Sequence, residues 1–349
     1  MGKLTMQDVA DVAGVSRITV WKVLTRKDGV SEKIRKRVED AATAIGYGQR
    51  GETQPTAKMG KTFSVVVARP ESSMFWMQII HNIAKELTRA RTNLLYTYIP
   101  SHWSEGYHLP PTVAPGQADG LIVLNIYDRD MLRMLTQVPL PKVFLDTVPN
   151  LPPQELKGDI VLVESFFKIR SITRSLAQSG RRRLSFIGDT VYAQTNADRL
   201  LGFQTGLREE GIPYDPATSL TGPLGLNSHY QEIKWFLDHL PEWPDAIVCC
   251  SDFIANFVLR YLEETGRPVP ENFLLTGFDN NKEYAAVADT ITTVNVDTAS
   301  LGKRLASQLL YRCDTPSAPQ EIIYQETELL WKAPLAPVQV AQGYPSFLL

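Results

Sequence analysis

The chain has 349 residues, of which 44% are hydrophobic and 21% are charged. This composition excludes a mostly disordered chain, and the length exceeds what one hydrophobic core usually supports, so two or three domains are expected. The net charge of -2 is unevenly divided: residues 1–60 carry eleven Lys and Arg against seven Asp and Glu, a balance of +4 that leaves -6 for the remainder. A basic first segment on an acidic body suggests a polyanionic partner at one end of the chain only.

The sequence gives no sign of export or of membrane insertion. The first ten residues lack an apolar core of signal-peptide length, and no apolar run approaches a membrane span. Cys249, Cys250 and Cys313 show no framework spacing, which is typical of a reducing cytosol. We therefore expect a cytoplasmic protein without a membrane partner.

Residues 3–47 predict three short helices. Thr5 is expected to cap the first helix, which Gly14 ends, and Ser16 to cap a second helix that extends to about residue 24. A third helix is expected to begin at Ser31. The apolar positions recur at helical spacing and predict one small core, made of Val9, Ala10, Ala13, Val15, Val20, Val23, Ile34, Val38, Ala41, Ala42 and Ile45. Three short helices with a tight Gly turn between the first two form the helix-turn-helix arrangement.

The second of these helices is suited to the major groove of DNA, because Val20 and Val23 anchor it and leave the opposite face exposed. Hydroxyls at its start can bond phosphates, and four basic side chains of the third helix add attraction that does not depend on sequence. These four are Lys33, Arg35, Lys36 and Arg37. The expected DNA-binding residues are Ser16, Arg17, Ile18, Thr19, Trp21, Lys22 and Ser31. The alternative is a solvated three-helix bundle that binds a protein.

The strings TMQDVADVAGVSRITV at 5–20, VSEKIRKRV at 30–38 and IGY at 45–47 closely resemble the head of the lactose-repressor (LacI/GalR) family. The resemblance implies a sequence-specific transcription regulator, by family default a repressor, whose partner is a double-stranded DNA operator. Trp21 and Lys22 depart from the family, which usually has Ser-Arg there. The Trp21 indole either stacks on a sugar or a thymine methyl, or packs on the third helix, and both interpretations remain open.

Residues 48–61 are polar and punctuated by Gly and Pro, and they predict a flexible linker. The family typically has a hinge helix here that folds on the operator and inserts a Leu into the minor groove. The matching positions of this chain hold Gln49, Arg50, Thr53 and Thr56, and Pro55 disfavours a helix. We therefore expect an atypical hinge with weak DNA bending or none.

From residue 62 onward, short apolar runs alternate with longer amphipathic segments. Strands are expected at 63–68, 94–98, 120–124, 142–145, 159–163, 184–187, 246–250 and 273–276, and helices at 77–89, 166–179, 197–210 and 254–264. This alternation implies parallel sheets, and its division near residue 162 suggests two similar lobes. The predicted fold class is α/β, with a helix-turn-helix head at 1–47 and a two-lobed body of parallel, doubly wound sheets at 62–332.

The resemblance to the lactose-repressor family continues through the body. It rests on ADGLIV at 118–123, PKVFLD at 141–146, DRLLGF at 198–203, PDAIVCCSD at 244–252, VPENFLLTGFD at 269–279 and TTV at 292–294. It implies a fold like that of periplasmic binding proteins, with one lobe at 62–162 and 293–319 and the other at 163–292 and 320–332. Pro110, Pro111 and Pro115 predict that a family helix within 101–117 is shortened or replaced by a loop.

Ligands of open parallel sheets bind beyond the carboxyl ends of the strands, and in two-lobed proteins they bind between the lobes. The resemblance implies a small-molecule effector there, possibly a sugar, bound by Phe75, Trp76, Thr195, Arg199, Leu224, Asp252 and Asp279. Other interpretations stay open, because Arg199 could pair with Asp198 or Asp252, and Asp279 could cap the next segment. Phe75 and Trp76 could equally be core residues.

No catalytic motif stands out, the five histidines lack ligand spacing, and neither a metal nor a cofactor is expected. Two further classes are kept as alternatives: a cytoplasmic solute-binding protein without a DNA role, and an enzyme on the same scaffold. Residues 333–349 form a tail that lacks heptads, so a homodimer is the expected assembly.

Overall fold

The computed structural model describes residues 5–24, 29–45, 60–68, 73–225, 227–284, 286–287 and 290–332. Contacts between Cα atoms divide the chain into two compact units, Met1–Met59 and Gly60–Leu349. The predicted hinge, apart from residues 60 and 61, and the tail at 333–349 lie outside the described residues.

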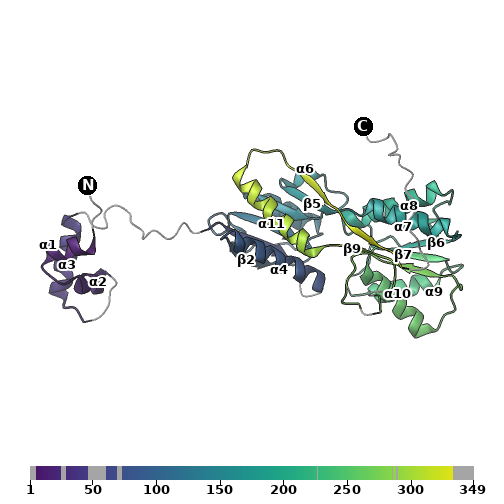
Figure 1. The fold of residues 1–349 in the computed structure, drawn as a ribbon, viewed down its shortest axis with the longest axis horizontal. Coiled ribbons are helices and arrows are strands. Elements are labelled where there is room, and N and C mark those ends of the chain that lie inside the picture. The colour runs from purple at the N-terminus through teal and green to yellow at the C-terminus, as the bar shows by residue number, and fades with distance from the viewer. Residues whose placement is uncertain are drawn as a thin grey trace. The chain divides into compact units, whose positions relative to one another are not determined.

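The first unit contains three helices, α1 (Met6–Ala13), α2 (Arg17–Leu24) and α3 (Glu32–Ala44), shown in purple in Figure 1. Thr5 caps α1 as predicted: its hydroxyl accepts the backbone N–H of Gln7 and Asp8, and the Asp8 carboxylate accepts the backbone N–H of Thr5. Gly14 ends α1 in the left-handed conformation, at φ 61°. The core of this unit consists of the predicted apolar side chains, with Val9, Val20 and Val38 fully buried.

A six-stranded parallel sheet forms the first lobe of the second unit. Its strand order is β10-β5-β4-β3-β1-β2. The strands are β1 (Thr62–Val67), β2 (Asn93–Tyr98), β3 (Gly120–Leu124), β4 (Lys142–Leu145), β5 (Asp159–Val163) and β10 (Ile322–Gln325). The strands β3, β4 and β5 are buried along their whole length, as expected for parallel strands covered on both faces.

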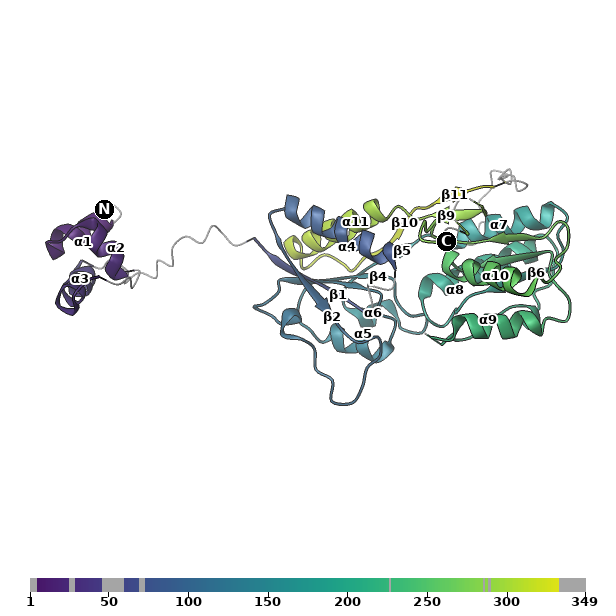
Figure 2. The same cartoon turned by 90° about the horizontal axis from the view of Figure 1, so that it is seen from below.

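Helices cover both faces of this sheet, as Figure 2 shows. The helices α4 (Met74–Arg89) and α11 (Thr298–Asp314) pack together on one face, over Phe63, Val65 and Val67. The helices α5 (Arg129–Thr136) and α6 (Pro153–Leu156) lie on the other face, in a separate core with Leu121 and Val123. Residues 101–117 contain no α-helix, only a 3-10 turn at Pro111–Val113, in agreement with the prediction from their prolines.

The second lobe is built on a parallel sheet of order β6-β7-β8, formed by β6 (Leu184–Ile187), β7 (Ala246–Cys249) and β8 (Leu274–Thr276). A bridge between Thr276 and Thr292 connects β8 to β9 (Thr293–Asn295), which pairs antiparallel with β11 (Glu328–Leu330). The helices α7 (Phe166–Gln178) and α8 (Gln194–Glu209) pack together on one side, and α9 (His229–Asp238) and α10 (Asp252–Thr265) on the other (Figure 1).

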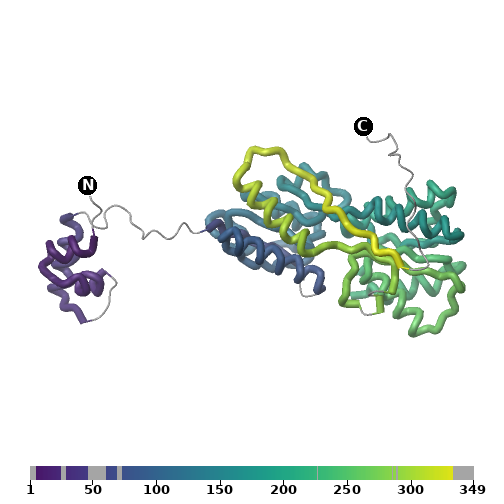
Figure 3. Tube along the Cα trace, in the orientation of Figure 1, coloured from purple at the N-terminus to yellow at the C-terminus, as the bar shows by residue number. Residues whose placement is uncertain are grey.

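The chain passes between the lobes three times, between β5 and α7, between β9 and α11, and between β10 and β11 (Figure 3). Two predicted lobe boundaries were therefore wrong. Residues 293–295 were assigned to the first lobe, but β9 pairs in the second. Residues 320–325 were assigned to the second lobe, but β10 pairs with β5 in the first. Both boundaries follow from the family resemblance, and a match of short strings does not show which strand a segment pairs with.

The mixed α/β fold class with parallel sheets is confirmed. Within the described parts of the chain, no helix combines the length and the apolarity that crossing a membrane requires.

Candidate functional site

The helix α2 presents a continuous exposed face on the first unit. Arg17, Ile18 and Trp21 are exposed, and Ile18 is 68% accessible, whereas Val20 and Val23 on the opposite face are buried. An isoleucine this exposed on a small three-helix unit gains nothing from folding, so its position suggests contact with a partner.

The hydroxyls at the start of α2 bond each other. Ser16 Oγ lies 2.9 Å from Thr19 Oγ1 and accepts the backbone N–H of Thr19 at 3.1 Å. Ser16 therefore caps the helix as predicted, and the first turn of α2 is preorganised. Lys22 is half-buried, and Ser31 is exposed before the first turn of α3, where its side chain makes no cap bond.

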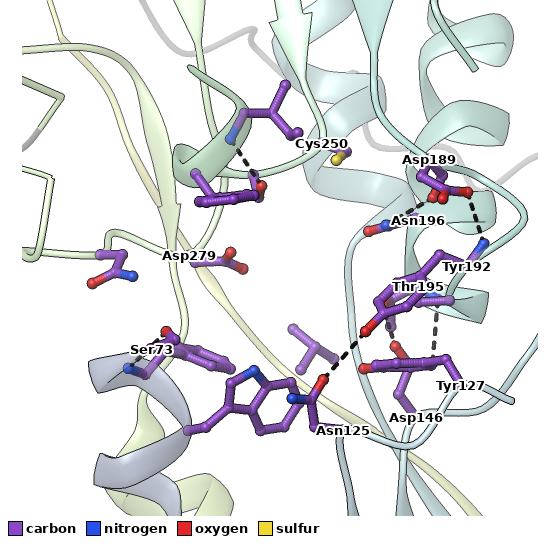
Figure 4. Close-up of a pocket in the computed structure, with 18 of the residues that line it drawn as sticks. Ser73, Asn125, Tyr127, Asp146, Asp189, Tyr192, Thr195, Asn196, Cys250 and Asp279 are labelled. Atoms are coloured by element: carbon purple, nitrogen blue, oxygen red, sulfur yellow. Dashed lines mark hydrogen bonds between the residues drawn. The ribbon is translucent and has the colours of Figure 1, made fainter. Parts of the chain in front are cut away.

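In the second unit, a cavity of about 370 Å³ lies between the two lobes. Figure 4 shows Tyr127, Tyr192 and Asp146 on one side of it and Ser73 and Asp279 on the other. Six of the seven predicted effector residues line this cavity, namely Phe75, Trp76, Thr195, Arg199, Leu224 and Asp279. The seventh, Asp252, is not part of the lining.

Three lining residues have a strained backbone at the ends of strands. Asn125 follows β3 with φ 53°, Asp146 follows β4 with φ 67°, and Asp279 lies after β8 with φ 99°. Positive φ is uncommon for residues other than glycine, although Asn and Asp tolerate it best. Strain of this kind clusters at functional sites, where it aims a side chain into a cavity. It coincides here with the carboxyl ends of parallel strands, where ligands of such sheets bind.

The side chain of Arg199, on α8, is nearly buried at 6% accessibility. Its guanidinium donates to the backbone oxygen of Cys250 and lies 3.6 Å from Asp279 Oδ1 (Nη2 to Oδ1). It also stacks on the Phe278 ring, 3.7 Å from the centroid. The pairing with Asp198 or Asp252 that the sequence left open is not formed. Its Nε is buried without a hydrogen-bond partner among the described residues.

Asp252 lies behind the cavity wall and supports it. Its Oδ1 accepts from Thr293 Oγ1 at 2.8 Å, and its Oδ2 accepts from the backbone N–H of Asn281 at 2.8 Å. Burial raises the pKa of Asp252 to about 6. It therefore positions the loop that carries Asn281 rather than contacting the cavity itself.

Asp146 connects the lobes beside the cavity. Its Oδ2 accepts from Thr195 Oγ1 at 2.5 Å, and its Oδ1 accepts from the backbone N–H of Thr195 at 3.3 Å. The backbone N–H of Gln194 also donates to the carbonyl of Thr147 at 2.7 Å. The first lobe thus supplies the acceptors for the N-terminus of α8, whose own cap residue, Ala193, offers no side-chain bond.

Aromatic side chains form much of the remaining wall. Phe75 and Trp76 are half-buried and pack edge to face, with centroids 5.4 Å apart, so they serve both the core and the cavity. Tyr127 and Tyr192 form a second pair, at 4.3 Å. Sequence reasoning missed Tyr127 together with His229, Phe253 and Tyr284, which also line the cavity. The only available signal was that two of these residues, Tyr127 and Phe253, lie shortly after predicted strands.

Among the residues with described positions, no group of three or more His, Cys, Asp or Glu side chains is arranged to hold a metal ion. Cys250 lines the cavity, but burial raises the pKa of its thiol to about 12, so it stays protonated and unreactive at neutral pH.

Comparison with known families gives two matches. The model of bacterial regulatory proteins of the lacI family matches residues 5–49, and the model of a periplasmic binding protein-like domain matches residues 173–333. Together they include α1 to α3 and most of the second lobe.

Curated relatives match along almost the whole chain. The HTH-type transcriptional regulator CelR of Thermobifida fusca is 25% identical over 331 residues, which are 93% of this chain and 96% of that protein. The HTH-type transcriptional repressor PurR of Mannheimia succiniciproducens is also 25% identical over 331 residues, 93% of this chain and 97% of that protein.

Solved structures share the fold. A complex of the transcriptional regulator CelR with cellobiose has a TM-score of 0.65 at 24% identity and covers 94% of this chain and 99% of that one. A lac repressor dimer bound to operator and the anti-inducer ONPF has a TM-score of 0.65 at 20% identity and covers 95% of this chain and 98% of that one.

Proposed function

Because this chain belongs to the lacI family of bacterial regulatory proteins, it is a helix-turn-helix transcriptional regulator, and we propose that a small polar ring compound between its lobes controls its binding to an operator. For the first unit, the proposal depends on the exposed face of α2, which lies opposite the buried Val20 and Val23. The helix α2 lies in the major groove, and Arg17, Ile18 and Trp21 contact base edges.

Two groups of positive side chains have different roles in this proposal. Arg17 contacts base edges, and Lys22 of the same helix adds positive charge beside it. The basic side chains of α3 attract the phosphate backbone without reading sequence. Ser16 and Thr19 bond phosphates at the N-terminus of α2, where the helix dipole favours an anion.

The cavity supports the effector half of the proposal. It combines aromatic faces, which stack on ring compounds, with carboxylate, amide and guanidinium groups, which bond hydroxyls in pairs. Arg199 and Asp279 place a guanidinium and a carboxylate together in this lining. Solved relatives carry such compounds: CelR was solved with cellobiose, and a LacI family regulator from Enterococcus faecium with bound ribose.

The mechanism is a shift between two arrangements of the lobes. A ligand bound by Arg199 and Asp279 of the second lobe and by Trp76 of the first stabilises the arrangement in which both lobes contact it. The ligand changes operator affinity only to the extent that it binds one arrangement of the lobes more tightly than the other. The regulator acts in the cytoplasm as a homodimer, its default action is repression, and it performs no catalysis.

Selection of duplexes from a random pool by the full-length protein tests the operator proposal. We expect a roughly palindromic consensus, because each head of a dimer reads one half-site. Arg17→Ala should relax the consensus at particular positions and weaken binding by about 1–3 kcal/mol. Arg37→Ala, which removes an equal charge from α3, should weaken binding to all sequences alike and leave the consensus unchanged. If the wild type selected no sequence, or if the two variants behaved alike, the assignment of α2 would be wrong.

A further inference from the structure

The cavity between the lobes is rich in carboxylates and poor in cations. Asp146, Asp189 and Asp279 line it, and Arg199 is the single Lys or Arg among the described lining residues. An adjoining cavity of about 460 Å³ shares Phe75, Asp279 and Asn281 with the first, so the two meet there. Its lining adds two carboxylates, Glu283 and Asp297, and one cation, Lys282. In the lining of the two cavities together, carboxylates thus outnumber Lys and Arg side chains.

The positive charge of Arg199 is already engaged. Asp279 pairs with it at 3.6 Å, and the guanidinium also bonds the Cys250 carbonyl and rests on the Phe278 ring. With its charge balanced in this way, Arg199 can donate to a hydroxyl or carbonyl oxygen, for which no net charge on the ligand is needed. An incoming phosphate or carboxylate would have to compete with Asp279 for the guanidinium.

Burial opposes the ionisation of two lining carboxyls, so their repulsion of an anion is strongest above neutral pH. Burial raises the pKa of Asp146 to about 6 and that of Asp279 to about 7, in spite of Arg199 nearby. The cavity therefore already disfavours the negative charges that it holds. A further anion would lie within a few ångströms of these carboxylates, in surroundings of low dielectric constant where charges repel strongly.

We propose that the cleft accepts an uncharged polar ring compound and excludes the phosphorylated or carboxylated forms of that compound, and that Asp279 is the residue that enforces the exclusion. This inference rests on the proposed function, since it names the chemical class of the effector. The aromatic walls bind the ring faces whatever the charge, so the discrimination comes from the carboxylates. The regulator then responds to the free compound and not to the product of a kinase that phosphorylates it.

A fractionated metabolite extract tests the proposal without knowledge of the ligand. A bacterial extract is passed over an anion exchanger, which retains phosphates and carboxylates, and its flow-through over a cation exchanger, so that the unretained pool holds only uncharged compounds. The melting temperature of the full-length protein is then measured with each pool, because a compound that binds only the folded protein raises it. We expect a rise with the unretained pool alone. A rise with the retained pool would overturn the charge exclusion, and no rise with either pool would overturn effector binding itself.

Mass spectrometry of protein recovered from the stabilising pool then identifies the ligand, which makes a matched comparison possible. The phosphate ester of the identified compound should bind at least about 100-fold more weakly than the compound itself, since two or more nearby carboxylates oppose it. Equal affinities would contradict the proposal even though the effector function would stand.

The variant Asp279→Asn tests the residue assignment. It keeps the shape of the side chain and releases Arg199 for a ligand anion, so the difference in affinity between the compound and its phosphate ester should shrink at least tenfold. Asp130→Asn removes the same formal charge from the exposed surface of α5 and should leave the discrimination unchanged. Melting curves of both variants check that they fold. Undiminished discrimination by folded Asp279→Asn would show that Asp279 does not select.

Discussion

The carboxyl group of Asp279 illustrates how a single residue can serve binding at the expense of stability. The backbone of this residue is held at φ 99°. Its carboxylate pairs with the guanidinium of Arg199, while the buried carboxyl of Asp252 repels it. Burial outweighs the attraction of the guanidinium, and the pKa of Asp279 rises to about 7. The pKa of this group is higher in the folded chain than in the unfolded chain. Between the two pKa values the folded state binds more protons, so the free energy of unfolding decreases as pH rises.

The variant Asp279→Asn should therefore stabilise the ligand-free protein at pH 8 and change it little at pH 4, close to the unfolded pKa. Between pH 4 and pH 7 the unfolded carboxyl loses its proton while the folded one keeps it, so the wild type loses free energy of unfolding over this window. An asparagine resembles the protonated acid and has no such loss. We expect a gain on the order of 1–2 kcal/mol at pH 8, measured by chemical denaturation. A variant that is equally destabilised at both pH values would contradict this account of Asp279.

Among the elements, α8 connects the chemistry of the cleft to the packing of the second lobe. Its N-terminus is held by Asp146 of the first lobe, and its next turn carries Arg199 into the cavity. Farther along, Gly202 lets α8 approach α7 so closely that a Cβ there would collide with the carbonyl oxygen of Phe166. The close approach fixes where the helix lies, and hence where the guanidinium reaches.

Gly202→Ala should destabilise the second unit by about 1–3 kcal/mol, even though alanine is the better helix former, because a backbone carbonyl cannot rotate away as a side chain can. Gly222→Ala is the matched control, since a Cβ at this loop position meets no atom within 4 Å. It should change stability by no more than about 0.5 kcal/mol. Thermal unfolding measures both changes, and equal melting temperatures for the two variants would show that α7 and α8 can separate without cost.

At the scale of the whole molecule, one face of the first lobe is unusually apolar. Tyr96 and Tyr98 are exposed on the edge strand β2, in register with Val65 and Val67, so they lie on the sheet face that α4 covers. Met77 of α4 is also exposed. A regulator that reads a palindromic site needs a twofold partner, and a cluster of large apolar side chains suits such a self-complementary contact.

We expect this face to join two copies of the chain. Tyr98→Glu and Met77→Glu should each convert a dimer into a monomer in analytical ultracentrifugation, because a buried unpaired charge opposes the contact. Trp235→Glu is the control: Trp235 is 64% exposed on α9 of the second lobe, outside this face, and its replacement should leave the dimer intact. A wild-type monomer at micromolar concentration, or dimers of all three variants, would contradict the assignment.

Local patterns predicted most elements of the chain correctly. The strands β3, β4, β5 and β6 lie at the expected residues, and Thr5 and Gly14 bound α1 as expected. These features depend on alternation, on cap geometry and on the positive φ of glycine, all of which act over a few residues. The resemblance of particular strings to one family pointed to Arg199 and Asp279, which line the cavity.

Pairing over long distances in the chain was decided only by the tertiary structure. It placed β10 beside β5 and β9 beside β11, moved Asp252 behind the wall of the cavity and brought Tyr127 and His229 into its lining. The sequence by itself determined the type and approximate extent of the elements with strong local patterns, because neighbouring residues make those choices. Exact bounds were less certain, since α4 and α8 each begin three residues before the predicted start. Which carboxylates face which guanidinium depends on how the lobes pack, and that arrangement of charges controls what the cleft can bind.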